Sequence, residues 1–285
     1  MSIVVTGATG HLGRLVVEAL LDRGVPAGEI VAAGRDTGRI ADLADRGVVV
    51  RRIDFAEPAS VAAAFAGADR VLLVSSSEVG QRAEQHRNAI DAARAAGVTL
   101  LAYTSIAQAD TTTMLLAAEH QATEAYLRDS GVPFALLRNG WYLENYTAQL
   151  PTVLEHGAIL GSAGEGRVSA ATRADYAAAA AAVLTTEGQA GRVYELGADE
   201  AFTLAELAAE ITRQTGTTVA YRDLPVAEYT QVLVGAGLPE AAATVFADSD
   251  LGIARGELFV DSGDLGRLIG RPTTSLAGGL AAALS

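Results

Sequence analysis

Short apolar runs alternate with longer segments whose apolar residues recur at helical spacing along the first half of the chain. The helical spacing predicts helices, the first from about residue 12 to Gly24, because residues three and four apart share one helix face. Strands that are apolar throughout suit a parallel sheet covered by helices on both faces. Strands are predicted at residues 3–5, 29–33, 48–53, 70–74, 99–103 and 134–137, with later helices at 36–45, 58–65, 81–96 and 115–129.

A glycine turn joins the first predicted strand to the first helix, in the order Thr-Gly-Ala-Thr-Gly-His-Leu-Gly from Thr6 to Gly13. A side chain at such a tight turn would block an approaching pyrophosphate, and the N–H groups that open the helix attract anions. This strand, turn and helix predict a Rossmann-type doubly wound α/β fold. Its expected parallel strand order is 3-2-1-4-5-6.

The pattern changes after Asn145. Residues 174–182 predict a buried, alanine-rich helix, and residues 193–196 could add a strand. Thr203 and Glu206 form a capping-box pattern, followed by a possible strand at 218–221 and one or two helices over 225–246. We expect a Rossmann domain over residues 1–145, to which roughly 170–200 returns. The smaller α/β lobe, residues 146–285, would be interleaved with it and lie at the carboxyl edge of the sheet.

Composition removes several classes of function. The net charge of −13 disfavours a nucleic-acid partner, and the absence of cysteine excludes thiolate chemistry and cysteine metal sites. The four histidines have no metal-ligand spacing, so no metal site is expected. No apolar run reaches the ~20 residues of a membrane span, and no signal-peptide pattern precedes the first strand. We therefore expect a cytoplasmic protein.

Arg35 follows the second predicted strand, where an acidic residue would accept from the ribose 2′-OH of NAD. Its guanidinium suits the 2′-phosphate of NADPH, and Gly34 leaves room for it. Two alternatives stay open: Arg35 could be a solvated surface residue, and Asp36 could serve NAD. Asp54 and Phe55 could bracket the adenine, or Asp54 could simply cap a helix.

The chain contains no lysine, since all 21 of its Lys and Arg residues are arginine. Short-chain dehydrogenases of the Tyr-x-x-x-Lys type lower the pKa of a tyrosine with that lysine, so their chemistry is unavailable here. The acceptor must then need little help from a protein acid. A quinone meets this condition because it becomes aromatic on reduction, which leaves orientation as the main catalytic task.

Two longer strings carry a family resemblance: residues 137–146, Leu-Arg-Asn-Gly-Trp-Tyr-Leu-Glu-Asn-Tyr, and residues 75–82, Ser-Ser-Ser-Glu-Val-Gly-Gln-Arg. With residues 169–176, 268–274 and the helix bearing Glu119, they resemble the NmrA-like atypical short-chain dehydrogenases. Within that family the likeness is to the bacterial NADPH-dependent quinone oxidoreductases. The resemblance implies a flavin-free reductase that uses NADPH (NADP) and a small-molecule quinone.

The resemblance also implies roles for individual residues. Asn145 would lie near the quinone, and Arg35 would bind the 2′-phosphate. The pyrophosphate would be held by Gly7, Ala8, Thr9, Gly10, His11 and Leu12, and the nicotinamide ribose by Ser75, Ser76 and Ser77. The nicotinamide end would be wrapped by Asn139, Gly140, Trp141, Tyr142, Leu143 and Glu144, with Arg173 nearby. Plainer interpretations are a strand end at Ser75 to Ser77, core aromatics at Trp141 and Tyr142, and a helix cap at Asn145.

His120 and Glu124 are four residues apart on a predicted helix and so share a face. They could form a proton relay at the active site, with His120 as a second catalytic residue, or a hydrogen-bonded pair on the surface. Another class of function also fits the family, namely a redox sensor that binds NADP(H) without turning it over. A different small electrophile, such as an activated alkene, would change only the acceptor.

Overall fold

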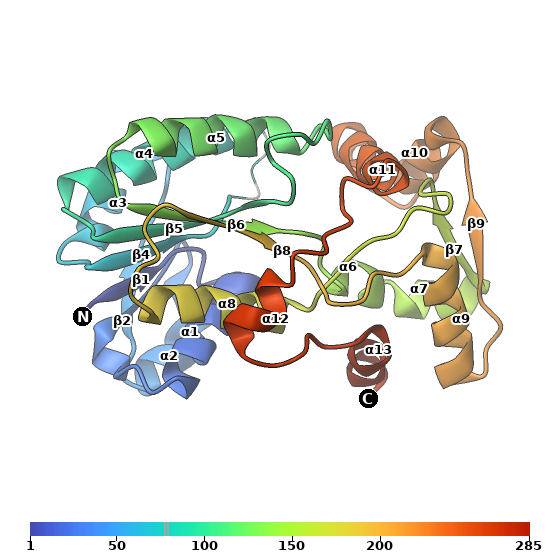
Figure 1. Ribbon diagram of the computed structural model, residues 1–285, viewed down its shortest axis with the longest axis horizontal. Helices are drawn as coiled ribbons and strands as arrows, with labels where there is room; N and C mark the ends of the chain where they lie inside the picture. The colour runs from blue at the N-terminus through green and yellow to red at the C-terminus, as the bar shows by residue number, and fades with distance from the viewer. Residues whose placement is uncertain (77, 79) are drawn as a thin grey trace.

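A parallel sheet with helices on both faces forms one part of the molecule, and a smaller α/β lobe forms the other (Figure 1). The computed structural model describes residues 1–76, 78 and 80–285. Within them, the large sheet has the strand order β3-β2-β1-β4-β5-β6-β8, which confirms the predicted order and adds β8 at the edge. The strands are β1 Ile3–Val5, β2 Ile30–Gly34, β3 Val49–Arg52, β4 Arg70–Leu73, β5 Leu100–Ile106, β6 Phe134–Asn139 and β8 Arg192–Leu196.

Helices cover the two faces of this sheet as the apolar pattern predicts. Helices α1, α8 and α12 pack together on one face, and α3, α4 and α5 pack together on the other (Figure 1). The predicted helix at 36–45 is divided, because Asp36 caps a short 3₁₀ turn that precedes α2. The elements are α1 His11–Asp22, η1 Ala27–Glu29, η2 Thr37–Ile40, α2 Ala41–Asp45, α3 Pro58–Phe65, α4 Arg82–Ala95, α5 Ala117–Asp129, α8 Arg173–Thr185 and α12 Asp264–Ile269.

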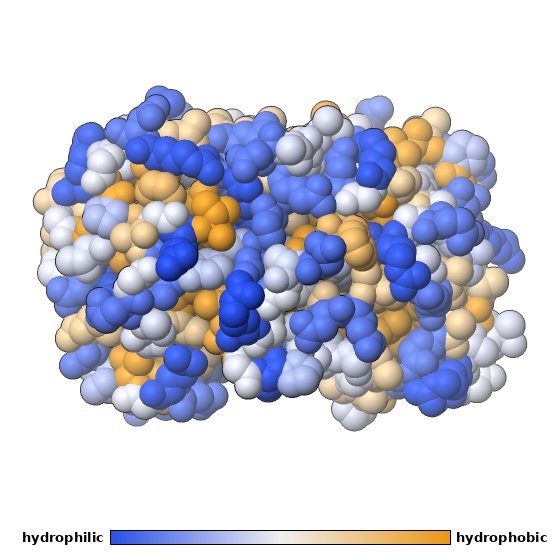
Figure 2. Space-filling model, in the orientation of Figure 1, coloured by the Kyte–Doolittle hydropathy of each residue, from blue (hydrophilic) through white to orange (hydrophobic). Residues whose placement is uncertain are grey.

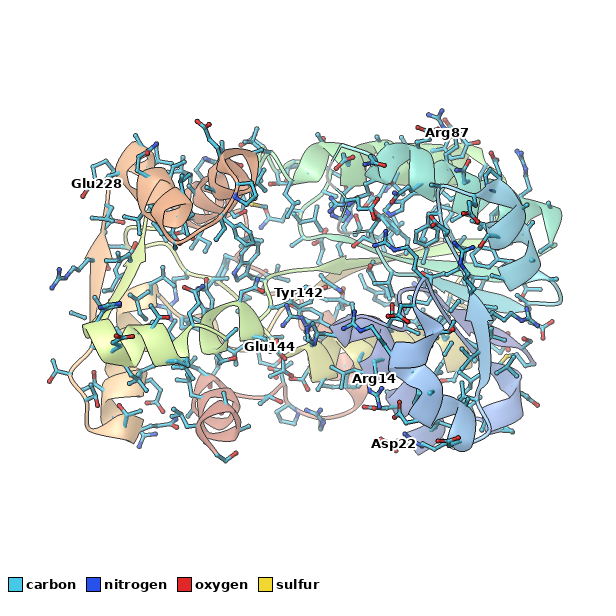
Figure 3. The ribbon with its side chains drawn as sticks, turned by 180° about the vertical axis from the view of Figure 1, so that it is seen from behind. Arg14, Asp22, Arg87, Tyr142, Glu144 and Glu228 are labelled. Carbon is cyan, nitrogen blue, oxygen red and sulfur yellow. The ribbon has the colours of Figure 1, made fainter. Side chains whose placement is uncertain are left out.

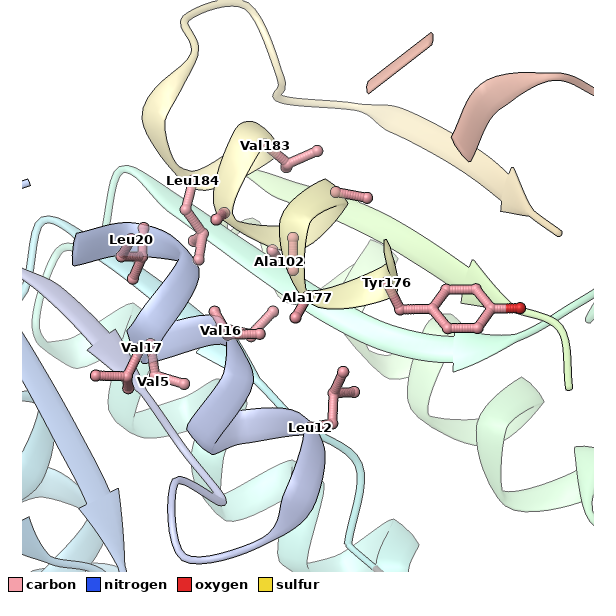
Figure 4. Close-up of a cluster of buried hydrophobic side chains, with 14 of the residues drawn as sticks. Val5, Leu12, Val16, Val17, Leu20, Ala102, Tyr176, Ala177, Val183 and Leu184 are labelled. Atoms are coloured by element: carbon pink, nitrogen blue, oxygen red, sulfur yellow. The ribbon is translucent and has the colours of Figure 1, made fainter. Parts of the chain in front are cut away.

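Alternate strand residues point into two separate cores. Val4 belongs to the core beneath α3 and α4, whereas Val5 belongs to the core beneath α1 and α8. In the second core, Val16 of α1 lies opposite Ala177 of α8 (Figure 4). The alanine-rich face of α8 lets the two helices approach closely, and all of these side chains are buried.

The smaller lobe contains a second parallel pair of strands, β7 and β9. The strand predicted at 218–221 is found two residues later, whereas β7, α6, α7, α12 and α13 were not predicted. Here the elements are α6 Glu144–Thr147, α7 Leu150–His156, β7 Ala158–Gly161, α9 Leu204–Thr215, β9 Ala220–Asp223, α10 Val226–Gly235, α11 Glu240–Ala254 and α13 Leu276–Leu284. The exact division of the chain at residue 145 stays a prediction.

The outer surface mixes polar and apolar side chains. Figure 2 shows polar side chains over much of one face, with small apolar areas among them on both parts of the molecule. Within the described residues, no helix has both the length and the apolar character needed to cross a membrane.

Candidate active site

The glycine turn between β1 and α1 is built from backbone contacts that leave no space for a side chain at Gly13. Gly7 has a positive φ of 63°, and the N–H of Gly10 donates to its carbonyl oxygen at 2.9 Å. A Cβ at Gly13 would lie 2.3 Å from the same oxygen. No side chain caps the helix at Gly10, so the first N–H groups of α1 are left for an anion.

A cleft of about 330 Å³ lies beside this turn, along the carboxyl ends of the first four strands. The position agrees with the rule that doubly wound sheets bind ligands beyond these ends. The lining residues are Gly7, Thr9, Gly10, His11, Leu12, Gly13, Gly34, Arg35, Arg39, Ile53, Asp54, Phe55, Val74, Ser75, Ser76, Glu78 and Gln85. Ala8 is completely buried behind the turn, where its N–H donates to Ala33.

Arg35 reaches the cleft from the end of β2, with 63% of its side chain exposed. Its guanidinium pairs with the carboxylate of Glu78, which also accepts from Gln85 Nε2 at 2.7 Å. These bonds, first from Gln85 and then from Arg35, lower the pKa of Glu78. Asp36, the alternative for NAD, accepts from the N–H of Gly38 at 3.2 Å.

The loop after β4 forms the wall of the cleft opposite Arg35. The N–H of Ser75 donates to Thr104 Oγ1 at 2.8 Å, and that of Ser76 donates to His86 Nε2 at 3.0 Å. Both serines follow the last residue of β4, Leu73, so they lie in a loop beyond the strand. The prediction for Ser77 falls outside the described residues.

β6 leads into a short polar segment between the large sheet and the smaller lobe. Gly140 donates its N–H to the carbonyl of Leu196 at 2.8 Å, and a Cβ there would lie 3.1 Å from that oxygen. Asn139 is buried, donates weakly to the hydroxyl of Tyr142 at 3.4 Å, and has an amide oxygen without a partner among the described residues. This oxygen is a free acceptor, and buried acceptors usually have a donor.

The guanidinium of Arg173, at the start of α8, contacts several of the residues that were predicted to lie near the nicotinamide or the quinone. The group lies 4.5 Å from the ring centre of Tyr142, 3.5 Å from Glu144 Oε2, and donates to Asn145 Oδ1 at 3.1 Å. Figure 3 shows Tyr142 and Glu144 between the sheet and the smaller lobe. Asn145 lies within α6, so its interpretation as a helix cap is wrong.

Trp141 and Leu143 have mainly packing contacts. Trp141 is half-buried against the apolar core of the smaller lobe, and Leu143 is buried where a Cβ at Gly279 would lie 2.2 Å from its Cδ2. Tyr142 packs edge-to-face on Tyr176 with ring centres 5.4 Å apart. Both aromatic residues therefore contribute to packing, as the plainer interpretation predicted.

A model of the NmrA-like family matches residues 1–253. The chain belongs to the NmrA-like family. This confirms the family resemblance carried by the two strings after β4 and at the end of β6.

Individual relatives resemble this NmrA-like chain over nearly its whole length. It is 52% identical to quinone oxidoreductase 2 of Escherichia coli K12, covering 96% of each chain. A crystal structure of the NADPH-dependent quinone oxidoreductase of E. coli with NADPH superposes with a TM-score of 0.96 at 50% identity, covering 99% of this chain and 100% of that one. A triphenylmethane reductase from Citrobacter sp. with NADP(H) has a TM-score of 0.93 at 38% identity, covering 99% and 100%.

His120 and Glu124 of this NmrA-like protein do not form a surface pair, so that interpretation is wrong. Both side chains are buried, at 5% and 1% exposure. His120 Nδ1 lies 2.7 Å from the hydroxyl of Tyr103, whereas Glu124 accepts from Ser105 and from Arg138. Burial lowers the pKa of His120 well below its usual range. Neither residue lines the cleft, and a catalytic role for His120 stays a prediction.

Sequence reasoning missed several residues that line or support the cleft. Arg39, Glu78 and Gln85 line the cleft, and His86 holds the loop behind Ser76. Glu78 belongs to the string at residues 75–82 that carries the family resemblance, so its position was a usable signal, whereas Gln85 lies outside the strings that carry it. No sequence signal pointed to His86, because a lone histidine on a helix is more often a packing residue.

Proposed function

We propose that this NmrA-like protein binds NADPH in the cleft and reduces quinones by direct hydride transfer, without flavin and without a Tyr-Lys dyad. The 52% identity to a quinone oxidoreductase over 96% of both chains carries the proposal. The absence of lysine supports the same acceptor, because a quinone needs no tyrosinate proton relay. Burial raises the pKa of Tyr142, so the tyrosine nearest Arg173 is a neutral phenol.

The residues of the cleft fit NADPH. The uncapped start of α1 and the glycines at positions 7, 10 and 13 would hold the pyrophosphate, with Thr9, His11 and Leu12 beside them. Arg35 and Arg39 are the cations for a 2′-phosphate, and Ser75 and Ser76 would contact the ribose. The free oxygen of Asn139 offers an acceptor to the amide of the nicotinamide.

When bound, NADPH supplies the hydride, and the chain's own residues position the two reactants. Arg173 would orient Asn145 through its bond to Oδ1, while Glu144 fixes the main chain of Arg173 by accepting its N–H at 2.8 Å. Asn145 would then direct the quinone toward the transferred hydride. Protons for the product oxygens come from water, so geometry supplies most of the acceleration.

A steady-state assay tests this proposal. Purified protein is mixed with NADPH and a small benzoquinone, and NADPH oxidation is followed by absorbance. We expect oxidation well above the uncatalysed rate. Tight binding of both NADP and NADPH with no turnover of any quinone would instead favour the redox-sensor alternative.

A second acceptor class has specific support. The chain is 38% identical to a triphenylmethane reductase over nearly its whole length. We therefore propose that electron-poor dyes can replace the quinone with the same cofactor. The same assay with a triphenylmethane dye measures whether the protein reduces such dyes. Decolorisation of the dye without any turnover of quinones would show that the dye, and not the quinone, is the preferred class of acceptor.

A further inference from the structure

The loop after β4 is held in place by side chains from behind the cleft. Three successive N–H groups donate to buried or partly buried acceptors: Val74 to Thr6 Oγ1 at 2.9 Å, Ser75 to Thr104 Oγ1 at 2.8 Å, and Ser76 to His86 Nε2 at 3.0 Å. These three donors are used inside the protein. At Val74, Ser75 and Ser76 a bound cofactor can therefore meet the side chains and carbonyl groups but not the N–H groups.

The hydrogen-bond pattern determines which nitrogen of His86 carries its proton. The hydroxyl of Thr123 donates its only proton to the carbonyl of Glu119 at 2.8 Å. Thr123 Oγ1, 3.0 Å from His86 Nδ1, must then accept from that nitrogen. His86 Nε2 is left with a lone pair, which accepts from the N–H of Ser76.

His86 is also held as a neutral ring. It is completely buried, with the rings of Phe55 and Tyr103 at 6.4 and 5.2 Å between centres. Burial, and secondly the charge of Arg82, lower the pKa of His86 to about 3. A protonated ring would lose the acceptor that Ser76 needs.

Arg82 and His86 are one helical turn apart on α4, and together they bind both main-chain groups of Ser76. Arg82 Nε donates to the carbonyl of Ser76 at 2.6 Å, while His86 accepts its N–H. Arg82 is itself buried, and its N–H donates to Glu119 at 3.1 Å. Residues four apart on a helix share a face, so one face of α4 sets the position of this residue.

We infer that His86 is a positioning residue for the cofactor: as a neutral acceptor it fixes Ser76 in the wall of the cleft against the ribose of NADPH. The inference rests on the proposed function, because it takes Ser76 as a cofactor contact. It does not make His86 a proton donor. Both ring nitrogens are occupied by Thr123 and Ser76, and the ring is closed off from the cleft.

Two substitutions of His86 test the roles of its two ring nitrogens separately. In His86→Gln the amide oxygen can reach the place of Nε2 and accept from Ser76. In His86→Asn the amide nitrogen takes the place of Nδ1, donates to Thr123, and leaves the N–H of Ser76 unpaired. Both variants lose the ring packing against Phe55 and Tyr103, so each is the control for the other.

The readout is the Kd of NADPH, measured by nicotinamide fluorescence without quinone, followed by KM and kcat. His86→Asn should weaken NADPH about tenfold, and His86→Gln about twofold or less, because only the first leaves a buried donor unpaired. The kcat of both variants at saturating NADPH should stay near that of the unaltered protein. Equal Kd values in the two variants, whether unchanged or equally weakened, would overturn the inference.

A measurement on the unaltered protein covers the case in which a variant fails to fold. Long-range ¹H–¹⁵N spectra of the histidine side chains should show His86 protonated on Nδ1 alone. Protonation on Nε2 would overturn the inference, since that nitrogen could not accept from Ser76. Because neither this nor the Kd uses a quinone, a failure here is distinct from a failure of the proposed reaction.

Discussion

At the scale of single residues, we expect cofactor choice to depend on Arg35 and its counter-ion, Glu78. The guanidinium of Arg35 is paired with the carboxylate of Glu78 across the cleft. A 2′-phosphate that binds Arg35 would have to displace this carboxylate. An exposed pair of this kind contributes only about 0–1 kcal/mol, and a phosphate offers more charge and bidentate bonds. We therefore expect the 2′-phosphate to displace Glu78 from Arg35, and Arg39 provides a second cation among the residues that line the cleft.

We predict that Arg35→Ala weakens NADPH by about tenfold or more while changing NADH about twofold or less, because charge-assisted hydrogen bonds contribute ~1.5–3 kcal/mol. Isothermal titration with each cofactor measures both values. Glu78→Gln is the matched control, since it removes the counter-ion but keeps the guanidinium, and it should leave NADPH as tight or tighter. Equal losses for both cofactors in Arg35→Ala would contradict the 2′-phosphate assignment.

The second prediction at this scale concerns Asn145. Asn145→Ala removes the amide that Arg173 orients, so the quinone should be misplaced while the cofactor is still held. We expect kcat to fall by roughly tenfold to a hundredfold, because small errors of geometry are costly in transfer reactions. The Kd of NADPH should stay within about twofold of the unaltered value. A variant with normal kcat would place Asn145 outside the reaction.

At the scale of elements, the sequence predicted those whose signals are local. The capping box of Thr203 and Glu206 is present at the start of α9, with both reciprocal bonds. β7 was not predicted because its four residues have no polar alternation and its partner, β9, lies far along the chain. The short helices α6 and α7 follow one another too closely for a periodic pattern to separate them.

The capping box allows a third prediction. Thr203→Ala should lower the free energy of unfolding by about 1 kcal/mol, since it leaves the N–H of Glu206 without its partner. Urea denaturation measures the change. The same substitution at Thr217, an exposed position after the same helix, is the control and should alter stability by less than about 0.5 kcal/mol. Equal effects at the two positions would contradict a role for the cap.

At the scale of the whole molecule, the sheet order was predictable but the buried polar interior was not. Parallel βαβ units and the glycine turn fix the order of strands by general rules. The burial of Glu124 depends on Ser105 and Arg138, which come from two different strands. Pairings between residues distant in the chain leave no periodic mark, so the helix pattern could not reveal which polar residues face inward.

Buried neutral histidines give the whole protein a predicted pH dependence. The pKa of His86 falls from 6.5 to about 3 on folding, so between these values the unfolded chain binds more protons than the native one. Stability is therefore lost as the pH falls through this window, by up to ~1.4 kcal/mol per pH unit for this group. The buried His120 acts in the same direction.

Urea denaturation at about pH 7 and about pH 5 tests this fourth prediction. His86→Gln should lose less stability between the two conditions than the unaltered protein, because it removes one of the groups that must be charged. The same substitution at the exposed His156 of α7 is the control. If His86→Gln and the unaltered protein lose the same free energy of unfolding between the two pH values, His86 is not held neutral in the folded protein.

Direct hydride transfer from NADPH to a quinone can be tested with an isotope on the cofactor. Flavin-free protein is loaded with NADPH carrying deuterium at the transferred position of C4 and mixed rapidly with benzoquinone. We predict fast oxidation in a single turnover, slowed by the deuterium because that bond breaks in the measured step. Oxidation no faster than in a protein-free mixture, in protein that binds NADPH, would contradict the claim.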